Sequence, residues 1–236
     1  MAGLFDDIKS TLPSYLSPED QIELLSELRK IVKGQALSGS AFYGSGEAAA
    51  IWQGDVFNAI TWVRMRAGVP SLEPQTFMVL SNTCDICTDN DRTRAMQVVL
   101  APVATIAKFR AYLEKSLDIK RVDGIVDGIR SQTNTMMFYL PKGGGGLAED
   151  SVVFLDSLQS IPLETLTADD KKRRQATLSG LGWYLLLVKL AMHFCRAFEN
   201  ERRPSAVSGD ARSALPLSRL RRLWNAVARR AWGAAS

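Results

Sequence analysis

A series of short apolar, β-branched runs in the middle of the chain constrains the fold more than any other feature. Turn-forming residues separate the runs, which cover residues 54–57, 77–81, 97–102, 135–140 and 151–156. Short strands at this density are typical of a small barrel or sandwich. The sequence therefore predicts a compact β-structure at the centre of the chain.

Helices are predicted before, within and after these strands. Ser17 and Pro18 have the residue types that open a helix, and an apolar stripe at helical spacing follows as far as Val32. Between the third and fourth strands along the chain, residues 106–130 carry a helical pattern that Gly124 and Gly128 weaken in its second half. The expected class is α+β.

The C-terminal part of the chain contains two further helical patterns. Residues 183–198 are apolar nearly all round, which is typical of a buried helix. Lys189, His193 and Arg196 argue against a membrane span there. Apolar residues at helical spacing from 217 to 232 mark a last helix. We expect a helical segment and linker (1–50), a barrel with its insertion at 106–130 (51–165), and a basic helical region (166–236).

Charge is distributed unevenly between the two parts of the chain. Residues 171–236 contain 14 Lys/Arg and 3 Asp/Glu, whereas residues 1–170 contain 15 Lys/Arg and 22 Asp/Glu. The net charges of +11 and −7 sum to the +4 of the whole chain. Such asymmetry indicates an anionic partner or a contact between the two parts.

Cysteine content and the N-terminal residues bear on the compartment. Three cysteines argue against a disulfide framework and favour a reducing environment. Residues 1–7 lack the basic and apolar regions of a signal peptide. We therefore expect a cytoplasmic protein without a membrane span.

The order of four motifs resembles the MazF/PemK/Kid toxin family. These motifs are Gly54–Phe57, Phe77–Ser81, Val98–Thr105 and Val152–Ser160, and the resemblance covers residues 54–162. It implies an SH3-like barrel, with residues 108–131 as an insertion relative to the family.

The resemblance also assigns two positions to catalysis. The family's catalytic threonine falls at Thr105 or at the neighbouring Ala104, whereas its catalytic arginine is replaced by Gln75, with Thr76 where a proline is usual. Cleavage through the 2′-hydroxyl needs a proton acceptor and a cation, and Gln75 supplies neither well. The replacement cations proposed from neighbouring loops are Arg64, Arg66, Arg92 and Arg94, of which Arg92 and Arg94 are the first choice.

Two functions follow from the resemblance. The first is a protein that binds or cleaves RNA without a metal or other cofactor, of the toxin or phage-defence type. Such a protein would be a homodimer with an antitoxin or complex subunit as its partner. The second is a barrel that has lost catalysis, as Gln75 indicates, and binds a protein partner or DNA.

A third reading depends on a reactive cysteine. Cys84 and Asp85 follow the second strand on a loop, where functional groups often lie. A thiol beside Arg92 or Arg94 would have a lowered pKa and serve as the nucleophile of a hydrolase. A triad with His193, the only histidine, extends this reading. The alternative is a packing role for Cys84 and a turn-capping role for Asp85.

The same cysteine belongs to a set of metal-ligand residue types. Cys84 and Cys87 have the spacing of a zinc-binding pair, and His193 and Cys195 are the remaining soft ligands. Residues two apart on a helix point about 200° away from each other, so His193 and Cys195 cannot both reach one ion. We therefore expect no metal site, and a zinc-binding protein that uses Cys84 is the further alternative.

The basic residues of the C-terminal region are candidates for nucleic-acid binding. Clustered arginine is typical of nucleic-acid-binding surfaces, and Trp224 and Trp232 have side chains that stack on bases. The alternative is an amphipathic helix that docks on the body or on a second subunit with its arginines in solvent. The candidates are Lys171, Lys172, Arg173, Arg174, Arg219, Arg221 and Arg222.

Overall fold

The computed structural model describes residues 26, 39–44, 50–66, 68–87, 95–143, 146–167 and 173–195. The predicted helix that begins at Ser17, apart from Ser26, and the predicted helix over 217–232 lie outside the described residues. The described part combines helices with one antiparallel sheet, as the α+β prediction requires.

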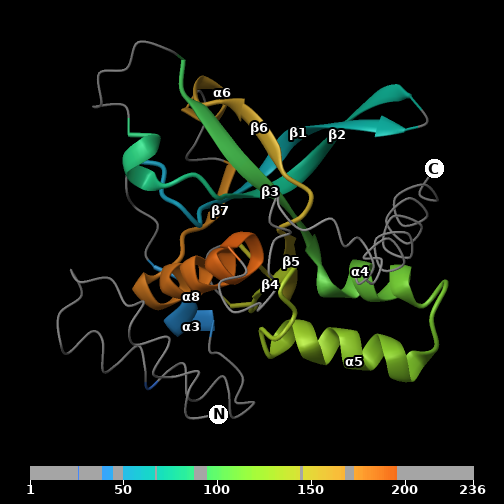
Figure 1. Ribbon diagram of the computed structural model, residues 1–236. Helices are drawn as coiled ribbons and strands as arrows, with labels where there is room; N and C mark the ends of the chain where they lie inside the picture. Colours follow the sequence, from blue (N-terminus) through green and yellow to red (C-terminus); the bar gives the residue numbers. More distant parts are fainter. Residues whose placement is uncertain are drawn as a thin grey trace, which may run out of the picture.

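Seven strands form this sheet, in the order β4-β5-β3-β2-β1-β7 with β6 paired to β3 (Figure 1). Their bounds are Val56–Arg66 (β1), Val69–Val79 (β2), Gln97–Thr105 (β3), Met137–Leu140 (β4), Ser151–Phe154 (β5), Gln159–Pro162 (β6) and Arg174–Ala176 (β7). The helices are α3 (Gly39–Phe42), α4 (Ile106–Leu113), α5 (Ile119–Arg130), α6 (Glu164–Thr167) and α8 (Gly180–Leu190). α4 and α5 confirm the helical pattern predicted for residues 106–130.

The first two strands are much longer than predicted. Each has 11 residues, and together they form a hairpin that extends from the body (Figure 1). Pro70 and Pro74 weaken the strand pattern in β2, because proline cannot donate to a ladder. The register shifts between Phe57 and Ile60, where Ala59 has φ of 54°. Such an irregularity bends the strand and increases its twist.

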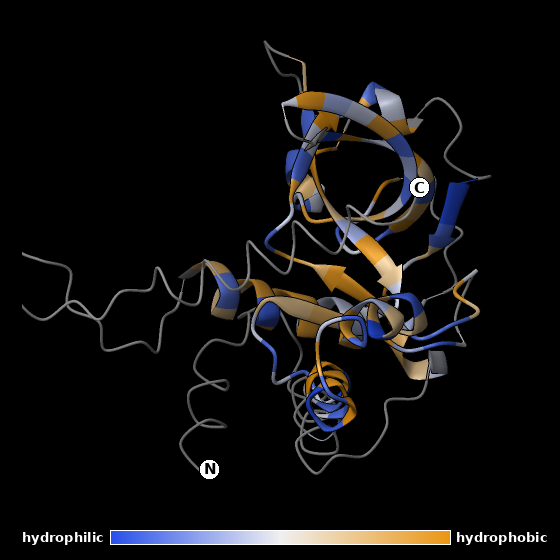
Figure 2. Ribbon diagram, turned by 90° about the vertical axis from the view of Figure 1, so that its right-hand side faces the viewer, coloured by the Kyte–Doolittle hydropathy of each residue, from blue (hydrophilic) through white to orange (hydrophobic). Residues whose placement is uncertain are grey.

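The bent hairpin brings β1 close to β6. β3 pairs with β6 through its first half and with β5 through its second half. The side-chain amide of Gln159 in β6 then donates to the Thr61 carbonyl (2.8 Å) and accepts from the Val63 amide (3.1 Å). The sheet thus curls into an incomplete ring, which Figure 2 shows from the side; in the described residues no strand pair closes it.

Alternation along the strands divides the core into layers. Phe77, Val79 and Leu100 face the inside of the curl with Trp62. Met78, Ala101 and Val103 face the opposite side, where α3 and α8 cover the sheet. A third cluster joins α4 and α5 to β4 and β5, with Phe109 against Phe154 at 5.3 Å between ring centroids. One face of the sheet is therefore shared by two layers. One is the interior of the curl, and the other is the pair of helices α4 and α5.

α8 is the buried helix that the sequence predicts in the apolar segment. Its residues Tyr184, Leu185 and Leu186 are buried, and Trp183 donates from Nε1 to the Gln53 side chain at 3.0 Å. β7 pairs with β1 at Val56 and Phe57, so residues 174–190 belong to the same sheet and core. None of the described helices combines the length and apolar character needed to span a membrane.

Lys189 on α8 makes the stability of the fold dependent on pH. Its ammonium group is buried and donates to the carbonyls of Gln132 and Asn134, the latter at 2.8 Å. Burial lowers the pKa of Lys189 from 10.5 to about 8. Between these values the unfolded chain binds more protons, so the free energy of unfolding rises with pH, by roughly 2–3 kcal/mol from pH 8 to 10.

Urea denaturation across this pH range tests the effect in the wild type and in Lys189→Met. We expect the rise in the wild type and its absence in the variant. Burial also raises the pKa of Tyr43 and Tyr139, so stability falls again above pH 10 in both proteins. Equal slopes below pH 10 would contradict the assignment to Lys189.

Candidate functional site

A pocket forms where β2 separates from β3. The two strands pair only from Thr76 and Val103 onward, and Ala104 and Thr105 pair instead with β5. Gln75, the residue before the pairing begins, donates from Nε2 to the Val103 carbonyl at 2.5 Å. The end of this ladder therefore leaves a gap beside the second half of β3.

Helix α4 forms the opposite wall of the pocket. Thr105 caps this helix, and its Oγ1 accepts from the Lys108 amide at 3.2 Å. Ile106, Phe109 and Leu113 are buried toward α5 and the sheet. Residues at positions i, i+3, i+4 and i+7 share one face of a helix. On α4 and the turn that follows it, this face consists of Lys108, Ala111, Tyr112 and Lys115.

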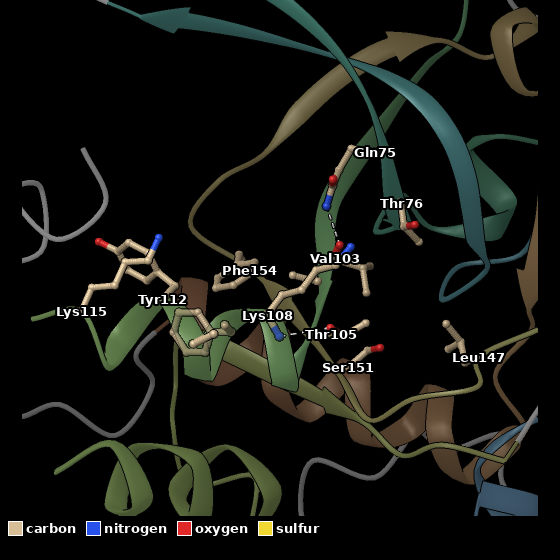
Figure 3. Close-up of a pocket in the computed structure, with 13 residues that line it drawn as sticks. Gln75, Thr76, Val103, Thr105, Lys108, Tyr112, Lys115, Leu147, Ser151 and Phe154 are labelled. Carbon is tan, nitrogen blue, oxygen red and sulfur yellow. Dashed lines mark hydrogen bonds between the residues drawn. The ribbon is translucent and has the colours of Figure 1, made fainter. Parts of the chain in front are cut away.

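The pocket has a volume of about 460 Å³ and lies between these two walls. Figure 3 shows Gln75 and Thr76 at the strand side, Tyr112 and Lys115 at the other end, and Lys108 between them. The interior is apolar and includes Val103, Phe109, Leu147 and Phe154. This volume is within the range of about 300–1,000 Å³ that is usual for small-molecule sites.

The polar lining of the pocket is basic or neutral. Lys108 and Lys115 are exposed, and hydroxyl groups come from Thr76, Thr105 and Ser151. The described residues that line it include no Asp, Glu, His or Cys. The site is therefore suited to an anion, and it offers no carboxylate, imidazole or thiol as a proton acceptor.

The structure brings together two positions that the resemblance assigns to catalysis. Gln75 and Thr105 both line this pocket. Of the proposed replacement cations, Arg64 does not join them: it stacks on Trp62 at 4.1 Å and lies 3.7 Å from Glu73, outside the pocket lining. Arg92, Arg94 and the side chain of Arg66 lie outside the described residues.

Because Thr105 caps α4, its replacement affects stability as well as chemistry. We expect Thr105→Ala to lower the free energy of unfolding by about 1 kcal/mol, whereas Thr105→Asn, which retains a capping side chain, keeps the wild-type value. Urea denaturation measures both effects. Equal losses in the two variants would contradict the capping role. Thr105→Asn is therefore the better variant for removing the hydroxyl in functional assays.

Cys84 and Asp85 lie away from this pocket, in a 3-10 turn over Thr83–Asp85. Both are exposed, and Asn82 caps the turn by accepting from the Cys84 amide at 2.9 Å. Cys84 and Cys87 are free thiols. Asn82 is therefore a cap of this turn.

The histidine is not part of the pocket either. His193 lies in a π-helical turn after α8 and packs against Phe194 at 4.7 Å between ring centroids. Among the described residues, no group of three or more His, Cys, Asp or Glu is arranged to hold a metal ion. The Cys195 side chain lies outside the described part.

The structure describes two of the basic C-terminal candidates, Arg173 and Arg174. Both side chains make contacts within the protein. Arg174 is buried; its Nε lies 3.5 Å from the buried Asp55 carboxylate, and its Nη2 donates to the Ala50 carbonyl at 2.8 Å. Arg173 donates to the Thr165 carbonyl at 2.7 Å. These contacts give Arg174 a structural role. The remaining candidates, Lys171, Lys172, Arg219, Arg221 and Arg222, lie outside the described residues.

The pocket includes side chains that the sequence did not single out for function. Lys108, Tyr112, Lys115 and Ser151 are examples. The i, i+4 and i+7 spacing along α4 and the turn that follows it is the signal that connects Lys108, Tyr112 and Lys115. No sequence pattern indicates that the end of β2 lies opposite them.

Comparisons with known proteins add no relationship. No protein-family model matches the chain, and no curated protein matches its sequence.

Proposed function

We propose that this chain is a MazF/PemK-like protein that binds RNA in the pocket between β2, β3 and α4. In this proposal the curled sheet is an SH3-like barrel, and residues 108–131 are an insertion into it. The observation that carries the proposal is the lining of the pocket. Lys108 and Lys115 accompany Gln75 and Thr105, without an acidic residue in the described lining.

The chemistry of RNA phosphates explains this choice. Lysines that neutralise phosphates supply most of the sequence-independent affinity of nucleic-acid-binding proteins. Hydroxyl and amide groups position the backbone by further hydrogen bonds, and Thr76 supplies a hydroxyl group to the lining. Acidic side chains in the lining would repel the phosphate, and the described lining has none.

Binding is better supported than cleavage. Metal-free cleavage needs a group that accepts the 2′-hydroxyl proton and a cation that stabilises the charged phosphate. Lys108 is a suitable cation, but Gln75 is neutral and the Thr105 hydroxyl already accepts from the Lys108 amide. The proposal is therefore RNA binding. Cleavage would in addition require the Thr105 hydroxyl to take part in the reaction.

The biological setting comes from the resemblance alone. A toxin or phage-defence role, a homodimer, an antitoxin or complex subunit as partner, and a cytoplasmic location are parts of the same proposal. A barrel that binds a protein partner or DNA is the alternative.

One experiment tests both binding and cleavage. The purified full chain is incubated with a mixed-sequence single-stranded RNA at low salt in the presence of EDTA, and retardation and product formation are measured. We expect retardation by the wild type and by Thr105→Asn. Cutting by the wild type that disappears in Thr105→Asn would add a metal-free ribonuclease activity. Absence of both retardation and cutting, in protein shown to be folded, would overturn the proposal.

A further inference from the structure

The pocket combines an aromatic interior with a basic rim, and α4 supplies most of both. Phe109 and Phe154 are buried in edge-to-face contact, with 73° between their rings. Tyr112 is half-buried and lines the pocket at the end away from the strands (Figure 3). Phe109 and Tyr112 belong to the helix, so the helix converts the end of the β2–β3 ladder into an open cleft.

The basic rim is on the same helix face as Tyr112. Lys108 and Lys115 are two turns apart, with Ala111 and Tyr112 between them, and both ammonium groups are on exposed side chains. Ala111 is the smallest side chain of this face, so it leaves room beside the tyrosine ring. A flat aromatic ligand with an attached anion matches this combination of apolar wall, open centre and cationic edge.

We infer that the pocket holds one nucleotide unit, with its base against the aromatic wall and its phosphate at Lys108 and Lys115. The inference rests on the RNA binding proposed above and names the feature of RNA that is recognised. Bases stack on aromatic side chains without strong sequence preference, because every base has a π-face. The ligand is either a free nucleotide or one unit of a single strand.

The size of the pocket does not suit double-stranded RNA. A base that is paired and stacked in a duplex presents only its edges and its backbone, so it cannot enter a pocket of about 460 Å³ between a strand and a helix. Unstacked bases of single strands are the usual targets of such aromatic sites. The preferred polymer is therefore single-stranded.

Calorimetric titration of the full chain with four probes tests the inference. The probes are a single-stranded RNA hexamer, an abasic ribose-phosphate hexamer, an RNA duplex and AMP. Ala111→Trp adds a bulky ring to the pocket lining, and Ala107→Trp on the same helix, outside the pocket lining, is the matched control. We expect the single strand to bind about tenfold more tightly than the abasic strand and the duplex. Ala111→Trp should remove that advantage, and Ala107→Trp should keep it.

The other outcomes distinguish the inference from the proposed function. Equal binding of the normal and abasic strands, unchanged by Ala111→Trp, would overturn the base site and leave phosphate binding in place. Binding of AMP that Ala111→Trp blocks, without binding of the hexamer, would retain the nucleotide site and overturn RNA binding. Binding of none of the probes would overturn both.

Discussion

Replacing Lys108 with glutamate is expected to weaken the binding of single-stranded RNA by about tenfold or more at ~0.1 M salt. The substitution reverses the charge at the centre of the pocket, where Figure 3 shows Lys108 between the strand side and the Tyr112 end. Loss of one phosphate contact should also lower the dependence of log K on log salt by about 0.7 for a single strand.

The variant is not expected to lose its fold. Lys108 is the third residue after the Thr105 cap, and glutamate at that position completes a capping box with threonine. A negative charge in the first turn also suits the helix dipole. Lys120 is an exposed lysine on α5 outside the pocket lining. Lys120→Glu makes the same charge change and should leave the affinity for single-stranded RNA nearly unchanged. Equal losses of RNA affinity in the two variants would show that binding depends only on the net charge of the protein, which would contradict the role of Lys108.

Asp55→Ala is expected to lower the free energy of unfolding by about 3–5 kcal/mol, measured by urea denaturation of the full chain. Asp55 is fully buried; one carboxylate oxygen accepts from the Trp52 amide at 2.9 Å and lies 3.5 Å from Arg174 Nε. The pair joins β7 to the turn before β1. Removal of the carboxylate leaves the buried guanidinium charge uncompensated, which accounts for the large cost.

Two further variants make this test specific. Asp127→Ala, at an exposed position of α5, should change the free energy of unfolding by less than about 0.5 kcal/mol. The double variant Asp55→Ala/Arg174→Met removes both charges and should recover part of the loss. A double variant as unstable as the sum of the two single variants would contradict a direct ion pair.

The apolar centres of the main strands and the insertion helices could be predicted from the sequence. A continuous apolar, β-branched run marks segments such as 97–102, and the stripe of Ile106, Phe109 and Leu113 marks α4. The outer parts of β1 and β2 could not be predicted, because two of their residues are prolines and apolar residues such as Val63 and Leu72 are exposed there. Gly124 and Gly128 did not prevent α5, since neither occupies one of its buried positions.

The candidate site was only partly accessible from the sequence. The resemblance pointed to Gln75 and Thr105, which line one pocket. The contribution of α4 depends on where β2 separates from β3, and this is a property of the tertiary structure. Arg174 shows the converse: it belongs to a run of basic residues typical of a solvated surface, yet its partner is the buried Asp55.

Crosslinking tests the location of RNA binding most directly. A single-stranded RNA that carries 4-thiouridine is irradiated with the full chain, and the crosslinked peptides are identified by mass spectrometry. The account predicts crosslinks within residues 103–115, chiefly at Tyr112, and their loss in Lys108→Glu. Crosslinks confined to other segments, such as the basic residues 217–232, would contradict the assignment of the pocket as the RNA site.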